Sequence, residues 1–146
     1  MAINKVLETN SPLQVAVPAS LAYPVLLTSV PLLLGTLAMV ANENNGDATR
    51  PATGNVSTDT SGAFRLTVTA ATGLSPLVGS AINPGDKIYA DGGTTDATTG
   101  IKYGFTLDKN SGGTLFGTAV STTGQTGPLL GAGATGVIEV LLQRGA

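Results

Sequence analysis

Three aspartates, Asp86, Asp91 and Asp96, are the residues of this sequence best placed to do chemistry, because they are close together along the chain. Paired carboxylates can act as general acid and general base. All three stand in or beside turns, however, and an aspartate in a turn usually accepts hydrogen bonds from its own backbone. We therefore expect structural aspartates and no enzyme. An enzyme that uses these three carboxylates is the alternative.

The segment Asp-Gly-Gly-Thr-Thr-Asp at 91–96 is loosely similar to a calcium-binding loop. It lacks the alternating ligands and the closing glutamate of such a loop, so we expect a simple hairpin connection. The chain contains no cysteine and no histidine, which removes disulfides, thiolate chemistry, the commonest general base and the commonest metal ligand. We predict no catalytic, metal-binding or cofactor-binding residues.

The glycines at 131, 133 and 136 match the letters of the dinucleotide-binding fingerprint. That motif must follow a strand and open a helix, whose N-terminus holds the pyrophosphate. Here the glycines lead into an apolar segment that is typical of a strand. We interpret them as a glycine-rich loop and expect no cofactor.

Charged residues are few and scattered. Seven Lys and Arg against nine Asp and Glu give a formal net charge of −2, and no basic cluster occurs. A nucleic-acid partner needs Lys and Arg to neutralise its phosphates, so we expect none. A net charge near zero and a hydrophobic content of 42% favour association. We expect a permanent partner, either copies of this chain or the surface of another protein.

No charged residue occurs between Glu8 and Glu43, which raises the question of membrane insertion. A spanning helix needs about 20 continuous apolar residues. Pro18, Pro24 and Pro31 interrupt this segment, and each interior proline removes a hydrogen-bond donor and destabilises a helix. We expect buried strands and no membrane partner.

The segment 62–70 shows the clearest structural pattern in the chain. Phe64, Leu66, Val68 and Ala70 alternate with polar residues, which predicts a strand with one face in the core. A turn at Asn-Pro-Gly-Asp, 83–86, introduces a further strand. The segment 42–61 either hides a short strand near 55–57 or forms an exposed loop. Other strands are expected at 13–17, 24–27, 32–34, 36–40, 87–90, 101–107, 115–120 and 137–142.

This pattern predicts an all-β sandwich or barrel, and the order of its segments resembles a known family. The segments are Pro-Val at 24–25 with Leu-Gly-Thr-Leu-Ala-Met-Val-Ala at 34–41, Gly-Ala-Phe-Arg-Leu-Thr-Val at 62–68, Ile-Asn-Pro-Gly-Asp-Lys-Ile-Tyr at 82–89, Leu-Phe-Gly-Thr-Ala-Val at 115–120 and Gly-Val-Ile-Glu-Val-Leu-Leu at 136–142. In that order they resemble the capsid decoration, or cement, proteins of tailed bacteriophages.

The resemblance implies a compact β-barrel or β-tulip-like module that binds the outside of the mature capsid and stabilises it. The implied partners are the major capsid protein and further copies of the chain, with a trimer favoured, and the implied location is the exterior of the virion. The alternative is another virion or cell-surface β interaction module, such as a spike, tail or adhesin-like domain.

Residues 1–20 are expected to form an extended N-terminal arm and lead-in, followed by a single β-domain at 21–146. Ile3, Val6, Leu7 and Leu13 are the apolar residues of the arm. A lead-in with apolar residues, no net charge and no core of its own is suited to docking on a neighbour. We expect these four side chains to contact the capsid.

Overall fold

The computed structural model describes residues 13–21, 29–49, 51–121 and 123–143, and this part of the chain is all-β. Its helical content is one short 3-10 turn at Ala19–Leu21. The strand expected at 24–27 lies outside the described residues. The strands are β1 (Leu13–Ala16), β2 (Pro31–Leu34), β3 (Leu37–Ala41), β4 (Asn55–Asp59), β5 (Ala63–Thr69), β6 (Ala71–Leu74), β7 (Leu77–Gly79), β8 (Lys87–Asp91), β9 (Thr94–Thr95), β10 (Ile101–Tyr103), β11 (Thr106–Asp108), β12 (Thr114–Val120) and β13 (Thr135–Leu142).

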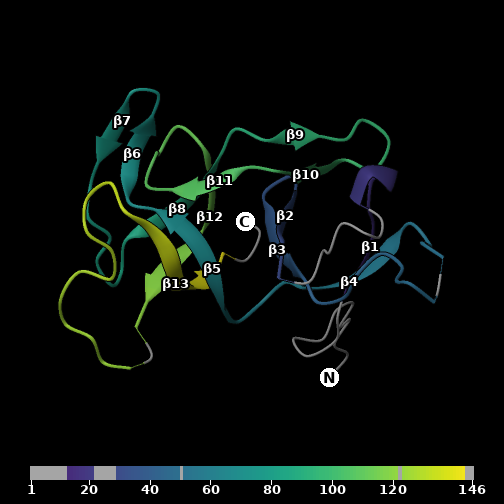
Figure 1. Ribbon diagram of the computed structural model, residues 1–146, viewed down its shortest axis with the longest axis horizontal. Helices are drawn as coiled ribbons and strands as arrows, with labels where there is room; N and C mark the ends of the chain where they lie inside the picture. The colour runs from purple at the N-terminus through teal and green to yellow at the C-terminus, as the bar shows by residue number, and fades with distance from the viewer. Residues whose placement is uncertain (1–12, 22–28, 50, 122, 144–146) are drawn as a thin grey trace, which may run out of the picture.

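Two antiparallel sheets make up the body of the molecule. A six-stranded sheet has the order β1-β4-β3-β2-β10-β9, and a five-stranded sheet has the order β11-β8-β12-β13-β5. The two sheets occupy opposite halves of the view in Figure 1. A separate two-stranded hairpin, β6–β7, extends from the five-stranded half.

The six-stranded sheet curls around a hydrophobic core of its own. Val15 on β1, Val56 on β4, Met39 on β3 and Ile101 on β10 all belong to this core, although they come from strands across the width of one sheet. Side chains so far apart across a flat sheet would not meet, so the sheet bends into a half-barrel around them.

The β2–β3 hairpin is buried on both faces, as its continuous apolar sequence predicted. Alternate side chains point to opposite sides of a strand. One set packs into the half-barrel core, and the other packs into a second core under the five-stranded sheet. The first set is Leu32, Met39 and Ala41, and the second is Leu33, Ala38 and Val40.

The second core fills the inner face of the five-stranded sheet. The alternation predicted for 62–70 is confirmed there, because Leu66 and Val68 are buried while Arg65 and Thr67 are exposed. The backbone N–H of Lys109, just after β11, donates to the carbonyl of Ala71, just after β5, at 2.8 Å. The two edges of this sheet therefore approach each other around the core.

The prediction of a single amphipathic strand at 101–107 is wrong. Gly104, with a φ of +68°, separates β10 from β11, and the two strands belong to different sheets. Ile101 and Tyr103 pack against the half-barrel core, whereas Phe105 and Leu107 pack into the other core. A positive φ favours glycine, so this position lets the chain turn from one sheet into the other.

The segment 42–61 contains a strand, β4, which lies between β1 and β3. The turn expected at 83–86 is also present, with the N–H of Asp86 bonded to the carbonyl of Asn83 at 3.1 Å and a φ of +95° at Gly85. β1 pairs with β4 from Leu13 to Ala16. The expected lead-in at 1–20 therefore includes a strand of the module itself.

Candidate functional site

The three aspartates noted in the sequence are each held by different neighbours. Asp86 accepts a hydrogen bond from the Asn83 N–H at 2.8 Å and forms a 3.0 Å ion pair with Lys109. Partial burial raises the pKa of Asp86, but the hydrogen bond from Asn83 and the bond and charge of Lys109 outweigh it and hold the pKa below its ordinary value. Asp86 thus links the 83–86 turn to Lys109, the residue directly after β11.

Asp96 performs a similar local role in the connection from β9 to β10. Its carboxylate accepts hydrogen bonds from the hydroxyl of Thr99 at 2.8 Å and from the N–H of Thr99 at 2.7 Å. These two bonds lower the pKa of Asp96, because they stabilise the ionised form. Such a bonding pattern is typical of a turn aspartate.

Asp91 takes part in a carboxyl pair that the sequence did not reveal. Its Oδ2 accepts a 2.8 Å hydrogen bond from the side-chain amide of Asn110, and the N–H of Asn110 donates to Asp108 Oδ1 at 2.9 Å. Asp108 is completely buried, and its Oδ2 has no hydrogen-bond partner. Burial raises the pKa of Asp108 to about 6; the hydrogen bond from Asn110 opposes this rise, and the negative charge of Asp91 adds to it.

The Asp91–Asp108 pair resembles an acid–base pair in one respect, since it places a carboxyl of raised pKa beside a second carboxyl. A catalytic acid must touch its substrate, however, and Asp108 exposes no surface. Within the described ranges, no group of three or more acidic residues is arranged to hold a metal ion. Asp108 is therefore interpreted as part of the protein interior.

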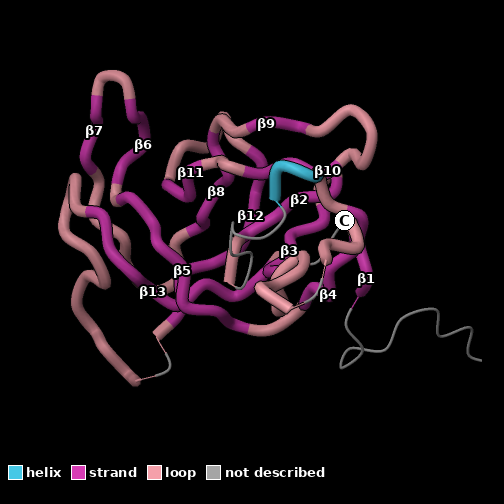
Figure 2. The backbone as a smooth tube through the Cα atoms, turned by 45° about the vertical axis from the view of Figure 1, so that its right-hand side comes forward, coloured by secondary structure: helices cyan, strands magenta, loops and turns pink. Residues whose placement is uncertain are grey.

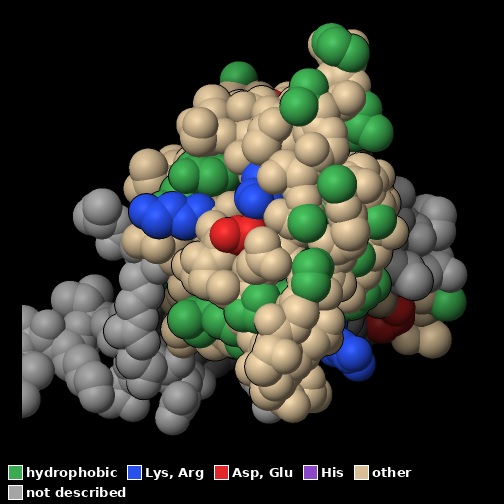
Figure 3. All heavy atoms as spheres, turned by 90° about the vertical axis from the view of Figure 1, so that its left-hand side faces the viewer, with side chains coloured by type: hydrophobic (Ala, Val, Ile, Leu, Met, Phe, Trp, Pro, Cys, Tyr) green, Lys and Arg blue, Asp and Glu red, His purple; other side chains and the backbone are tan. Residues whose placement is uncertain are grey.

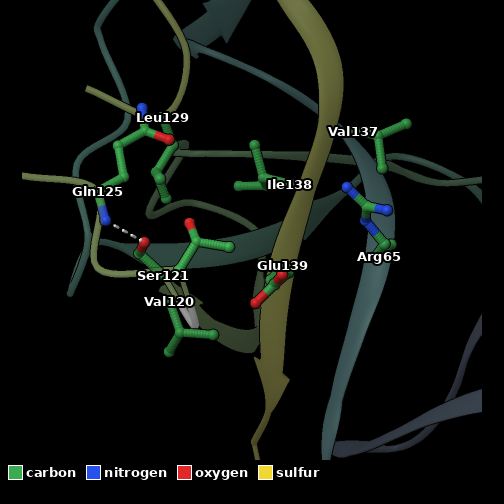
Figure 4. A pocket seen from close by; sticks show the side chains of 9 residues that line it. Arg65, Val120, Ser121, Gln125, Leu129, Val137, Ile138 and Glu139 are labelled. Carbon is green, nitrogen blue, oxygen red and sulfur yellow. Dashed lines mark hydrogen bonds between the residues drawn. The ribbon is translucent and has the colours of Figure 1, made fainter. Parts of the chain in front are cut away.

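Two cavities of the described chain are small. One of about 130 Å³ lies at the outer side of β13, between Arg65 on β5 and Ser121 and Gln125 from the connection that follows β12 (Figure 4). The backbone N–H of Gln125 donates to the Ser121 hydroxyl at 2.9 Å, so these two polar groups satisfy each other. A second cavity of about 280 Å³ lies beside the segment 43–55. Sites for small ligands usually measure roughly 300–1,000 Å³.

The glycine-rich segment 131–136 serves as a packing surface in this structure. It leads directly into β13, and the N–H of Gly133 donates to the carbonyl of Ala70 at 2.7 Å. A Cβ added to Gly79 would lie 2.9 Å from the nitrogen of Gly133, so the two segments touch backbone to backbone. The glycines thus allow the 131–134 turn to support the base of the β6–β7 hairpin.

The largest concentration of exposed apolar side chains in the described chain lies on the β6–β7 hairpin. Leu77 and Val78 are 55% and 51% exposed, and Leu74 is 37% exposed. We call these three residues, with the exposed Pro76 at the turn, the apolar hairpin. It projects from the body in both backbone views (Figures 1 and 2).

Figure 3 views the molecule from the side of this hairpin and shows hydrophobic side chains on the protruding tip, with the charged side chains well below it. Sequence reasoning missed this element because 71–79 shows no alternating pattern, and its Gly73, Pro76 and Gly79 are typical of a break between strands. The informative signal was the pair of short apolar segments around Pro76.

Three residues of the expected capsid-contact arm, Ile3, Val6 and Leu7, lie outside the described residues. Leu13 lies at the start of β1, partly buried against the half-barrel core, and its carbonyl accepts a 2.9 Å hydrogen bond from the Thr58 hydroxyl. The side chain of Leu13 therefore packs within this module. Among the described residues, no helix has the length and apolar character needed to cross a membrane.

Comparisons of this chain with family models, with curated proteins and with solved structures give no match.

Proposed function

We propose that this chain is a structural virion protein that binds the outer surface of a mature bacteriophage capsid and stabilises its lattice. Its partners are the major capsid protein and further copies of itself, with a trimer favoured. The observation that carries the proposal is the apolar hairpin, because an all-β module with a projecting apolar tip is suited to burying that tip on another protein. The resemblance in segment order gives independent support.

A binding protein of this kind needs no catalytic chemistry. A protein that binds the assembled shell but not its dissociated subunits stabilises the shell by mass action. Several copies held together bind with avidity, so each contact can be weak. The aspartates that could have acted as catalysts instead bond to neighbouring groups of the fold.

Co-sedimentation tests this function directly. The probe is mature heads of the phage that encodes this chain, assembled without its gene, with unexpanded precursor heads as the control. The chain is expected to sediment with mature heads, to saturate at a fixed number of copies and to raise the temperature at which the heads release their DNA. Failure to bind mature heads would contradict the proposal and favour a spike, tail or cell-surface module.

The N-terminal arm is proposed as one of the contacts. Deleting residues 1–12 is expected to abolish binding to the heads and to leave the module folded, since β1 begins only at Leu13. Circular dichroism and thermal melting of the truncated chain provide the control. Undiminished binding by the truncated chain would exclude this role for Ile3, Val6 and Leu7.

A further inference from the structure

The apolar hairpin is held rigidly at its base. The carbonyl of Ala70 accepts hydrogen bonds from the N–H of Ser80 at 2.9 Å and from the N–H of Gly133 at 2.7 Å, so both ends of the hairpin are tied to one point. The bond from Lys109 to the carbonyl of Ala71 adds a third attachment at 2.8 Å. Binding is stronger when the binding element is already in its bound conformation, since less entropy is lost.

Close backbone contact fixes the direction of the hairpin. Gly79, the last residue of β7, approaches Gly133 so closely that a Cβ at this position would lie 2.9 Å from the Gly133 nitrogen. Leu77 lies on the same side, with its Cδ2 3.7 Å from where a Cβ of Gly133 would stand. The hairpin therefore rests on the 131–134 turn at its base, while its tip extends into solvent.

The charge distribution limits what this tip can bind. No charged residue occurs between Arg65 and Asp86, a segment that includes the whole hairpin. Lys109, whose Nζ donates to the carbonyl of Ala81 just beyond the hairpin at 2.9 Å, is neutralised by Asp86 in an ion pair of 3.0 Å. Nucleic acids and anionic membranes are bound through basic side chains, which this tip lacks. A neutral, apolar concave surface on a folded protein is complementary to it.

The area of the apolar hairpin sets the strength of one contact. Its large apolar side chains are only about a third to a half exposed, so they offer far less than the about 800 Å² that each partner contributes to a stable protein–protein interface. A single hairpin would therefore bind weakly on its own. Weak contacts become effective when several copies engage a partner that repeats with fixed spacing.

We propose that the apolar hairpin, Leu74, Pro76, Leu77 and Val78, is the element that docks into a neutral apolar groove repeated on the outer surface of the capsid. This inference rests on the proposed function and names the contact through which it operates. The two strands carry the side chains outward, and the bonds at Ala70 hold them in position before binding.

Paired substitutions test the hairpin against a matched site. Val78→Asp lies on the hairpin, and Val137→Asp places the same change on the outer side of β13, where the valine is 60% exposed. Because both valines are largely exposed, both variants are expected to fold, as circular dichroism would verify. Val78→Asp combined with Leu77→Asp is expected to weaken binding to mature heads at least about tenfold, while Val137→Asp leaves binding unchanged.

A labelling experiment tests the same contact without adding charge. The chain has no cysteine, so Leu77→Cys and Val137→Cys each introduce a single reactive thiol. On heads, the Leu77→Cys thiol is expected to react with a maleimide at least about tenfold more slowly than in the free protein, since a docked tip excludes the reagent. The Val137→Cys thiol is expected to react equally fast in both states.

The outcomes separate this inference from the function on which it rests. If the unaltered chain does not bind mature heads, the proposed function and the hairpin inference are both contradicted. If it binds and the double variant binds equally well, or if both thiols are protected alike, only the hairpin inference is overturned. It is also overturned if the double variant dissociates an oligomer of the free protein, or if the unaltered chain binds phosphatidylcholine vesicles and the double variant does not.

Discussion

Replacing the buried Asp108 with asparagine is expected to stabilise the protein at neutral and alkaline pH. Asp108 exposes no surface, and its Oδ2 has no hydrogen-bond partner. Asp108→Asn keeps the side-chain oxygen that accepts from the N–H of Asn110. Its new amide replaces the unpartnered oxygen with a donor that can bond to Asp91.

The magnitude follows from the pKa of Asp108, which burial raises from 3.8 to about 6. That difference of about 2 pH units corresponds to about 3 kcal/mol of unfolding free energy. A raised pKa means that the folded state holds the proton more tightly than the unfolded state. The contribution to stability is therefore complete below pH 3.8, declines as the pH rises and is lost above about pH 6.

Chemical denaturation at pH 4.5, 6 and 8 measures this effect. The unaltered protein is expected to lose stability across this range, and Asp108→Asn is expected to lose much less. At pH 8 the variant should be more stable by about 1–3 kcal/mol, which is roughly 2–12 °C in melting temperature for a chain of this size. Asp91→Asn is the control, since removing the neighbouring charge should weaken the pH dependence without abolishing it.

A result in which Asp108→Asn is less stable than the unaltered protein at pH 8 would refute the reasoning. It would show that the ionised carboxylate of Asp108 is stabilised by its surroundings. An unchanged slope between pH 4.5 and 8 in the variant would refute it equally, since another group would then account for the titration.

Three further tests probe other parts of the fold. Gly117→Ala should destabilise the protein by about 2–4 kcal/mol, because the added Cβ would collide with a carbonyl of β13. Gly127→Ala is the control, since a Cβ there meets nothing within 4 Å and the change should be neutral. Urea denaturation compares the two variants. Lys109→Met should lower the free energy of unfolding by about 1 kcal/mol at pH 7 and by less at pH 3. The pKa of Asp86 is lowered in the folded state, so the ion pair contributes stability above pH 3.8 and loses it as the pH falls. Equal losses at both pH values would contradict that assignment. Leu33→Ala, at a fully buried position, should cost about 2–5 kcal/mol in denaturant unfolding, and a loss below 1 kcal/mol would argue against a close-packed core there.

The all-β class and several strands could be predicted because their signals are local. Alternation in β5 identified Leu66 and Val68 as core residues, and the continuous apolar sequence of β2 and β3 indicated burial on both faces. These patterns reflect the geometry of a single strand. They need no knowledge of which strands are neighbours.

Features that depend on two distant segments could not be predicted in the same way. The alternation at 101–107 continues through Gly104, although the chain changes sheets there, because alternate residues on both sides of Gly104 pack against a core, each pair against a different one. The environment of Asp108 depends on β8, which contributes Asp91. The exposed apolar hairpin breaks the rule that apolar side chains are buried, which is the kind of exception that binding sites produce.

The β2–β3 hairpin couples the stability of the two halves of the molecule, because it contributes to both cores. Leu32 and Leu33 are adjacent in sequence but belong to different hydrophobic cores. Unfolding this hairpin would therefore disrupt both cores at once. Heating should consequently melt both halves in one cooperative event, with coincident signals from probes placed in each. A truncated gene that encodes only one half without the β2–β3 hairpin is expected to yield an insoluble fragment.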